Sequence, residues 1–380
     1  MGMTVKANII DRLGRATIRK AIQGKTAESR ANAVQKIGRE IRDSQLSEAD
    51  RIFATKLMDK ICEDVSALVR RALSVTLRKS PHLPLHIARQ LIEDIDSVAV
   101  PILSDSPVIT DEDLTAVLNS KAAEKVRAIA QRKTLGLHIS HAIVSFGDSQ
   151  ATARLAANDG ALISGETAEL IADMYADDDL IRNAALARED FPSEVITKLI
   201  DHSTDKLTAN LKTYPGMSDR RAGLISRDVA ERSRSYVTGE NWSQKRLRDY
   251  TRSLDKAGKL TPRLILRAAG RGDMRFVLTA VSLLGQQKLE KTQLLVLAGN
   301  GIGAKAAAIR ARFSPEQVLL FTSCVDTWLA VERENTALNQ IQFQRKVAER
   351  VISLDLNLSE EMEFELFDLL DSATTLKLVA

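Results

Sequence analysis

The chain has few cysteines, prolines, glycines and aromatic residues, and the first three shortages exclude classes of protein. Only two of its 380 residues, Cys62 and Cys324, are cysteines, which excludes a disulfide framework and a cysteine-rich metal module. Aromatic residues make up 4% of the chain. With only eight prolines and eighteen glycines, the composition also excludes a collagen-like or Pro/Gly-rich disordered protein.

Net charge and long apolar runs are also scarce. The 54 Lys and Arg residues against 50 Asp and Glu residues leave a net charge of only +4. The uncharged stretches stop short of the ~18 apolar residues of a membrane helix, and residues 1–19 contain no long apolar run like that of a signal peptide. We therefore expect a soluble, cytoplasmic protein without membrane insertion.

Apolar residues recur at helical spacing along most of the chain. Segments such as Ser66–Leu77, Glu124–Arg132 and Lys245–Leu254 place apolar residues on one side and charges on the other. Short breakers such as Ser80-Pro81 and Tyr214-Pro215-Gly216 separate these segments. The pattern predicts an all-α fold of helices about 10–15 residues long.

An internal repeat organises these helices. Five apolar residues, which we call anchors, each precede a predicted helix start; they are Leu83, Leu135, Phe191, Leu260 and Phe313. Successive anchors are 52, 56, 69 and 53 residues apart. Apolar residues recur four, eight, sixteen and twenty positions after most anchors. Each repeat therefore holds about four short helices, which predicts an α-solenoid of stacked helical hairpins, a HEAT/armadillo-like superhelix.

Polar residues also recur at fixed offsets. Thirteen residues after the anchors stand Asp96, Asp148, Thr204, Asp273 and Asp326. An active-site role is one interpretation, but the offset falls between two apolar helical sets, where helix N-caps are expected. The pairs Val69-Arg70, Val126-Arg127 and Ile181-Arg182 precede three anchors, and we expect these arginines to bind neighbouring carbonyl groups.

The chain divides into four segments by composition. A basic amphipathic helical segment covers residues 1–45, and HEAT-like repeats cover residues 46–239. Further helical repeats cover residues 240–350, after an irregular stretch that contains several arginines in place of a clean hairpin. Residues 351–380 hold seven acidic residues with interleaved apolar ones, which predicts an acidic amphipathic capping helix.

Several of these segments resemble a known family. The run from Leu46 to Leu73, the Leu83-Pro84 pair and the stretch from Val98 to Pro107 are similar to the bacterial domain-of-unknown-function 2336 family. Later repeats carry the same likeness, at Val126–Arg132, Leu186–Pro192, Arg271–Asp273 and Ala298–Gly301. The resemblance covers roughly residues 46–335. It implies a HEAT-like helical protein and supplies no catalytic residues.

No motif in the sequence indicates catalysis, a cofactor or a metal. The glycines of Gly299–Gly303 depart from the spacing of a dinucleotide-binding loop, and their surroundings are helical, so we expect them to end one helix and start the next. His138 and His141 share a helix face without a cysteine nearby, and Asp177–Asp179 lacks the spacing of a calcium loop. We therefore expect a non-enzymatic protein.

One charge pattern indicates a binding site. Residues 218–275 hold fifteen Lys or Arg and seven Asp or Glu, and within them four arginines follow one another at helical spacing: Arg263, Arg267, Arg271 and Arg275. Such a row can hold phosphate or carboxylate groups through paired N–H donors, or can be a solvated helix face. We expect a scaffolding or regulatory module that binds another protein. The alternative is a nucleic-acid-binding protein that uses this region, with Tyr236, Trp242 and Tyr250 for stacking.

Overall fold

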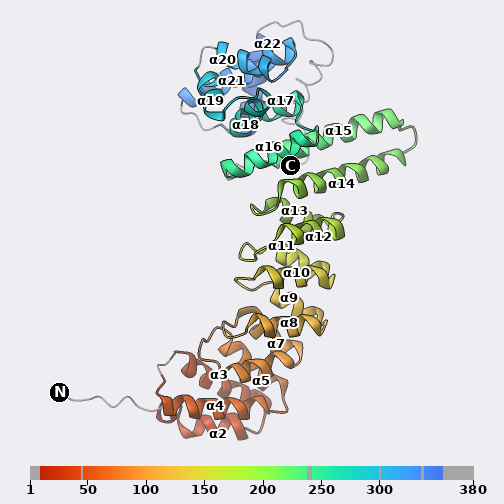
Figure 1. The fold of residues 1–380 in the computed structure, drawn as a ribbon. Coiled ribbons are helices and arrows are strands. Elements are labelled where there is room, and N and C mark those ends of the chain that lie inside the picture. The colour runs from red at the N-terminus through yellow and green to blue at the C-terminus, as the bar shows by residue number, and fades with distance from the viewer. Residues whose placement is uncertain (1–8, 44–45, 238–241, 299–300, 335–337, 354–380) are drawn as a thin grey trace, which may run out of the picture. The chain divides into compact units, whose positions relative to one another are not determined.

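In the computed structural model the chain is all-α (Figure 1). The structure describes residues 9–43, 46–237, 242–298, 301–334 and 338–353. These residues form helices and no strand, with one isolated bridge between Leu135 and Ala161. The all-α prediction is confirmed. The contacts divide the chain into unit 1, Met1–Asp190, and unit 2, Phe191–Ala380.

The described residues of unit 1 form thirteen helices. They are α1 (Ile9–Leu13), α2 (Arg15–Gln23), α3 (Ala27–Asp43), α4 (Glu48–Cys62), α5 (Ala67–Leu77), α6 (Leu85–Glu93), α7 (Asp96–Asp105), α8 (Asp111–Asn119), α9 (Ala123–Ile129), α10 (Leu137–Phe146), α11 (Ser149–Ala156), α12 (Gly165–Tyr175) and α13 (Asp179–Ala187). Odd-numbered helices from α3 to α13 contact one another in succession, and even-numbered helices from α2 to α12 do the same. Unit 1 therefore consists of two rows of helices, with the apolar core between them.

Unit 2 contains nine helices among its described residues. They are α14 (Ser193–Lys212), α15 (Asp219–Tyr236), α16 (Gln244–Lys256), α17 (Pro262–Gly270), α18 (Met274–Leu284), α19 (Leu289–Val296), α20 (Ile302–Arg310), α21 (Pro315–Glu334) and α22 (Gln340–Ser353). Helices α14, α16, α18 and α20 contact one another in succession, and α15 contacts α17, which contacts α21. The long helices α14 and α15 pack against each other. The irregular stretch before residue 240, which is expected from the sequence to lack a clean hairpin, therefore forms a helical hairpin. Its arginines do not prevent this, since Arg220, Arg221 and Arg227 are exposed. The buried Arg234 donates a hydrogen bond to Asp201 of α14.

The anchor residues lie where the repeat pattern places them. All five are buried, and each stands two residues before a helix: α6, α10, α14, α17 and α21. The segments that begin at Leu83, Leu135 and Leu260 each contain four helices, whereas the longer segment that begins at Phe191 contains the three longer helices α14 to α16. The apolar pattern therefore predicts where these five helices begin.

The capping prediction is confirmed at two of the five positions. Asp148 accepts a hydrogen bond from the backbone N–H of Ala151 at the start of α11, and Asp273 caps α18 in the same way. Asp96 is the first residue of α7 and makes no capping bond. The prediction is wrong for Thr204 and Asp326, because α14 and α21 are each 20 residues long and run through these positions.

Arginines of the odd row tie successive helices of unit 1 together. Arg70 of α5 donates to both carboxylate oxygens of Asp94, before α7, and Arg127 of α9 does the same to Asp148. Arg70 also donates to the backbone carbonyl of Asp64, and Arg182 donates to that of Ala176. The predicted carbonyl bonds are present for these two arginines, and the carboxylate pairs add a link between neighbouring helices.

The segment boundaries expected from the sequence do not coincide with the boundary between the two units, which lies between residues 190 and 191. The division between residues 239 and 240 lies inside unit 2, and residues 238–241 are outside the described residues. In the N-terminal segment α2 contacts α3 and α4, and α3 contacts α5, so its described helices pack on the rest of unit 1. The acidic capping helix is predicted for residues 351–380. Of these, residues 354–380 lie outside the described residues.

Candidate anionic-partner site

The four arginines singled out by spacing lie in unit 2 at the junction of α17 and α18. Thr261 caps α17, whose first residue is Pro262, and this start places Arg263 and Arg267 one turn apart on α17. Arg271 is the C-cap residue of the same helix, and Arg275 lies in the first turn of α18.

Two of these arginines face acidic side chains of α15. Arg267 is 7% exposed and pairs with Asp228, and its Nε atom lies 3.9 Å from an oxygen of Glu231. An Nη atom of Arg263 lies 3.2 Å from an oxygen of Asp228, and its Nε lies 3.4 Å from Glu231. These pairs link α17 to α15 within the unit.

The other two arginines contact the end of α15 and the residue Trp242, which precedes α16. Arg271 donates to the hydroxyl of Ser235 at 3.0 Å, and its guanidinium lies 3.9 Å from the centre of the Tyr236 ring. Burial lowers the pKa of Arg271 from its usual value. Arg275 donates to the backbone carbonyl of Trp242 at 2.5 Å. All four arginines therefore have partners within unit 2, and their binding of an external anion stays a prediction.

The aromatic residues considered for base stacking are mostly inside unit 2. Tyr250 is fully buried and donates its hydroxyl to the backbone carbonyl of Arg234. Trp242 is buried, packs edge-on against Tyr250 and is covered by the Arg246 guanidinium, 3.7 Å from the ring centre. The expectation that all three aromatic residues are available for stacking is wrong for these two, because they build the core beneath α16.

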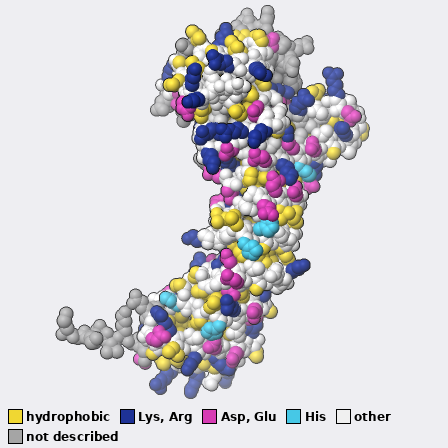
Figure 2. Space-filling model, viewed as in Figure 1, with side chains coloured by type: hydrophobic (Ala, Val, Ile, Leu, Met, Phe, Trp, Pro, Cys, Tyr) yellow, Lys and Arg dark blue, Asp and Glu magenta, His cyan; other side chains and the backbone are white. Residues whose placement is uncertain are grey.

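The exposed face of α16 carries a second set of basic residues that we did not single out from the sequence. Lys245, Arg248, Arg252 and Lys256 follow the spacing i, i+3, i+7, i+11, which places them on one side of the helix, and all four are exposed. We call this set the α16 basic row. Figure 2 shows a row of Lys and Arg side chains over the part of unit 2 where α16 lies in Figure 1.

The acidic residues of α16 are too few to neutralise the α16 basic row. Asp249 and Asp255 are the acidic residues of the helix, and an oxygen of Asp249 lies 3.9 Å from Arg252, at the limit of an ion pair. Exposed pairs of this kind contribute at most about 1 kcal/mol and are screened by salt. The row lies within the basic stretch 218–275, and the helical spacing of its charges is the signal in the sequence that marks it.

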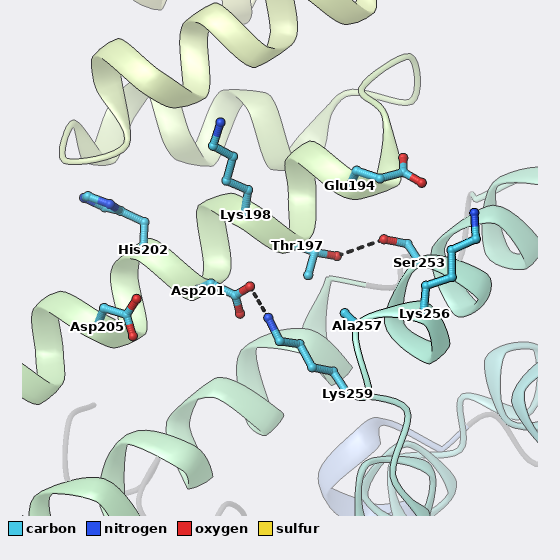
Figure 3. Close-up of a pocket in the computed structure, with 10 residues that line it drawn as sticks. All are labelled: Glu194, Thr197, Lys198, Asp201, His202, Asp205, Ser253, Lys256, Ala257 and Lys259. Atoms are coloured by element: carbon cyan, nitrogen blue, oxygen red, sulfur yellow. Dashed lines mark hydrogen bonds and ion pairs between the residues drawn. The ribbon is translucent and has the colours of Figure 1, made fainter.

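A polar cleft of about 530 Å³ adjoins one end of the row (Figure 3). It lies between α14 and the end of α16, and Lys256 belongs to both the row and the cleft. Asp201 accepts hydrogen bonds from Lys259 and from Arg234, and the hydroxyls of Thr197 and Ser253 lie 3.4 Å apart. The cleft presents charges of both signs. A site for an anion would present mainly positive charge, so we do not assign the cleft as an anion site.

The remaining candidates for chemistry are separate from one another. His141 bonds to the hydroxyl of Thr167 at 3.1 Å, and His86 pairs with Asp59 at 3.0 Å. Among the residues that the structure describes, no group of three His, Cys, Asp or Glu side chains could hold a metal ion. Cys62 and Cys324 are free and buried.

Comparison with known proteins gives one result. Residues 98–355, more than half of the chain, match the model of a family described as "Uncharacterised protein conserved in bacteria (DUF2336)". The chain belongs to this family. The predicted membership is confirmed, although the motifs before Val98 lie outside the matched part.

The DUF2336 match covers the parts of the molecule that carry the candidate sites. The α16 basic row, the arginines of α17 and the polar cleft all lie within residues 98–355. No curated protein and no solved structure matches the chain. No helix among the described residues is long and apolar enough to cross a membrane.

Proposed function

We propose that this DUF2336 protein is a HEAT-like α-solenoid that works as a non-catalytic protein-interaction module in the bacterial cytoplasm. The two rows of helices in unit 1 support the fold part of the proposal, because each helix pair packs on the next in chain order. The pairs from Arg70 to Asp94 and from Arg127 to Asp148 repeat one link between successive helices. A structure of this kind offers an extended surface to a partner segment.

The α16 basic row carries the functional part of the proposal. From Lys245 to Lys256 the helix rises about 16 Å, so four cationic groups are spread along one face over the length of a short peptide. The chain's own packing holds that face outward, since Leu247, Tyr250 and Leu254 anchor the opposite side in the core. We infer that the partner is a protein with an acidic segment that binds along this row.

Nucleic acid is the second candidate for the same row. A row of exposed Lys and Arg side chains can also bind a phosphate backbone. Such binding releases counterions, so its affinity falls steeply as the salt concentration rises. The net charge of +4 and the burial of Trp242 and Tyr250 favour the acidic protein segment.

Fluorescence anisotropy of two defined probes tests the proposal. A labelled polyglutamate peptide and a labelled DNA duplex are titrated with the full-length protein and with a variant that carries Glu at Lys245, Arg248, Arg252 and Lys256. Exposed charge pairs contribute up to about 1 kcal/mol each, so we expect the reversal to weaken peptide binding about tenfold or more. The control variant carries Glu at four exposed basic residues of unit 1: Arg15, Arg19, Lys36 and Arg39.

The outcomes separate the candidates. Peptide binding that the control variant keeps and the row variant loses supports the interaction module. Stronger binding of the duplex, with a steep loss of affinity as salt rises, supports nucleic acid instead. Equal binding by wild type, row variant and control would remove the row from the proposal. If the row variant loses peptide binding, a pull-down from nuclease-treated bacterial lysate identifies the partner protein. That partner is recovered by wild type and not by the row variant.

A further inference from the structure

Helices α19 and α20 present large apolar side chains to solvent. Leu294 of α19 is 77% exposed, and Ile302 and Ile309 of α20 are 72% and 56% exposed. Ile302 and Ile309 are seven residues apart and therefore lie on one face of α20, which packs against α19. A group of exposed large apolar residues on contacting helices marks a surface that another segment covers. We call Leu294, Ile302 and Ile309 the α19–α20 apolar face.

Basic residues surround this face. Residues 286–314 contain five basic residues and one acidic residue, Glu290, a net charge of +4, and all six are exposed; the basic ones are Lys288, Lys291, Lys305, Arg310 and Arg312. Figure 2 shows hydrophobic and basic side chains together over the part of unit 2 where α19 and α20 lie in Figure 1. The occupant of this surface must therefore be both apolar and acidic.

The chain itself contains a segment with both properties. Residues 354–380 hold seven acidic residues and one basic residue, Lys377, which leaves a charge of −6. Apolar residues interleave with the acidic ones, namely Met362, Phe364, Leu366, Phe367, Leu369 and Leu370. The segment follows α22, which contacts α21 and α17 in the same unit. Its 27 residues, from 354 to 380, can extend over at most about 90 Å, enough to reach any helix of unit 2.

We propose that residues 354–380 bind to the α19–α20 apolar face of their own chain. The apolar residues of the segment cover Leu294, Ile302 and Ile309, and its carboxylates face the surrounding lysines and arginines. Being tethered raises the effective concentration of the segment, so it prevails over a free partner of similar affinity. The surface is separate from the α16 basic row, and this proposal does not depend on the proposed function.

Photo-crosslinking in the full-length protein tests the proposal. The photoreactive amino acid p-benzoylphenylalanine replaces Phe367, and the cross-linked peptides are identified by mass spectrometry. We expect cross-links within one chain to peptides from residues 289–312. Replacing Leu294, Ile302 and Ile309 with Ser removes most of the apolar contact, so the yield of these cross-links falls about tenfold or more. Because the three side chains are exposed, the helical content measured by circular dichroism stays unchanged.

Charge variants separate this proposal from the proposed function. Reversal of Lys291, Lys305 and Arg310 to Glu lowers the cross-link yield, whereas reversal of the α16 basic row leaves it unchanged and acts only on polyglutamate binding. Cross-links to other helices, cross-links between two chains, or a yield that the Ser variant does not change would each overturn the proposal.

Discussion

At the scale of single residues, Asp148 combines two roles in unit 1. Its carboxylate accepts the backbone N–H of Ala151 at the start of α11, and it accepts two hydrogen bonds from Arg127 of α9. The hydrogen bond from Arg127 lowers the pKa of Asp148 below its usual value. The ionised form therefore stabilises both the start of α11 and the link between α9 and α11.

We predict that two substitutions at Asp148 separate these roles. Asp148→Asn keeps a good N-cap but removes the charge, and should lower the free energy of unfolding by about 1 kcal/mol. Asp148→Ala removes the cap as well, and should lower it by about 2 kcal/mol or more. Urea denaturation followed by circular dichroism measures both values. Asp159→Asn, the same change at an exposed residue of unit 1, should have little effect.

The pH dependence of the Asp148→Asn effect follows from the lowered pKa. The stabilisation is fully present above the unfolded pKa of about 3.9, and it is lost as the pH falls through the lower pKa of the folded state. The difference in unfolding free energy between wild type and Asp148→Asn should therefore be largest near neutral pH and shrink in acid. A difference that stays constant down to about pH 2 would contradict the role assigned to the ionised carboxylate.

The two cysteines give a second residue-scale prediction. Burial raises the pKa of Cys62 and of Cys324 to about 12. Because the thiolate is the reactive form, both side chains should resist alkylation by iodoacetamide at about pH 8 in the folded protein. Unfolding in guanidinium chloride should make both react rapidly, and mass spectrometry counts the alkylated residues. Rapid labelling of either thiol under native conditions would show that its side chain is not enclosed in the core.

At the scale of elements, α3 and α5 approach closely because Gly38 has no side chain. A Cβ atom at Gly38 would lie 2.6 Å from Cγ2 and 2.9 Å from Cβ of Thr76 on α5. Gly223 of α15 is also inside a helix, but a Cβ atom there would meet nothing within 4 Å. The two glycines therefore differ only in what surrounds them.

We predict effects of opposite sign for the same substitution at these glycines. Gly38→Ala should destabilise the protein by about 1–3 kcal/mol, because α3 and α5 must separate. Gly223→Ala should stabilise it by about 0.5–1 kcal/mol, because alanine favours the helix. Thermal unfolding of both variants checks the signs. Adding Thr76→Ser to Gly38→Ala removes the methyl group and should recover part of the loss, and no recovery would argue against this contact as the cause.

Elements also show where sequence reasoning was sufficient. The anchors Leu83, Leu135 and Phe191 predicted helix starts to within two residues, because a buried apolar residue and a polar or proline start are local features. Reasoning failed at Thr204 and Asp326, where helices of 20 residues continue past the expected start. Thr and Asp also occur inside helices, so the presence of such a residue does not by itself show that one helix ends and another begins there.

At the scale of the whole molecule, each unit has its own core. Leu73, Ile87 and Ile143 are fully or almost fully buried in unit 1, as are Phe276 and Phe321 in unit 2. We predict that residues 1–190 and 191–380, expressed separately, each show a helical circular dichroism spectrum and a cooperative thermal transition. A fragment that unfolds without a transition would show that its core depends on the other half of the chain.

The candidate binding surface could not be chosen from the sequence in the same way. Arg263, Arg267 and Arg271 have helical spacing, and so do Lys245, Arg248, Arg252 and Lys256. The first set packs against α15, where Arg263 and Arg267 pair with Asp228, whereas the second set is exposed. Spacing shows which residues share a helix face, and it does not show what that face contacts.

The sequence by itself determined the all-α class, the starts of most helices and the family, because these depend on apolar periodicity and on residues close together in the chain. Only the tertiary structure decided that the arginines of α17 serve the contact with α15, and that the row on α16 and the apolar face of α19 and α20 meet solvent. The physical reason is that exposure depends on which helices pack together. Residues such as Asp228 and Arg267, 39 positions apart, meet only after the helices have packed.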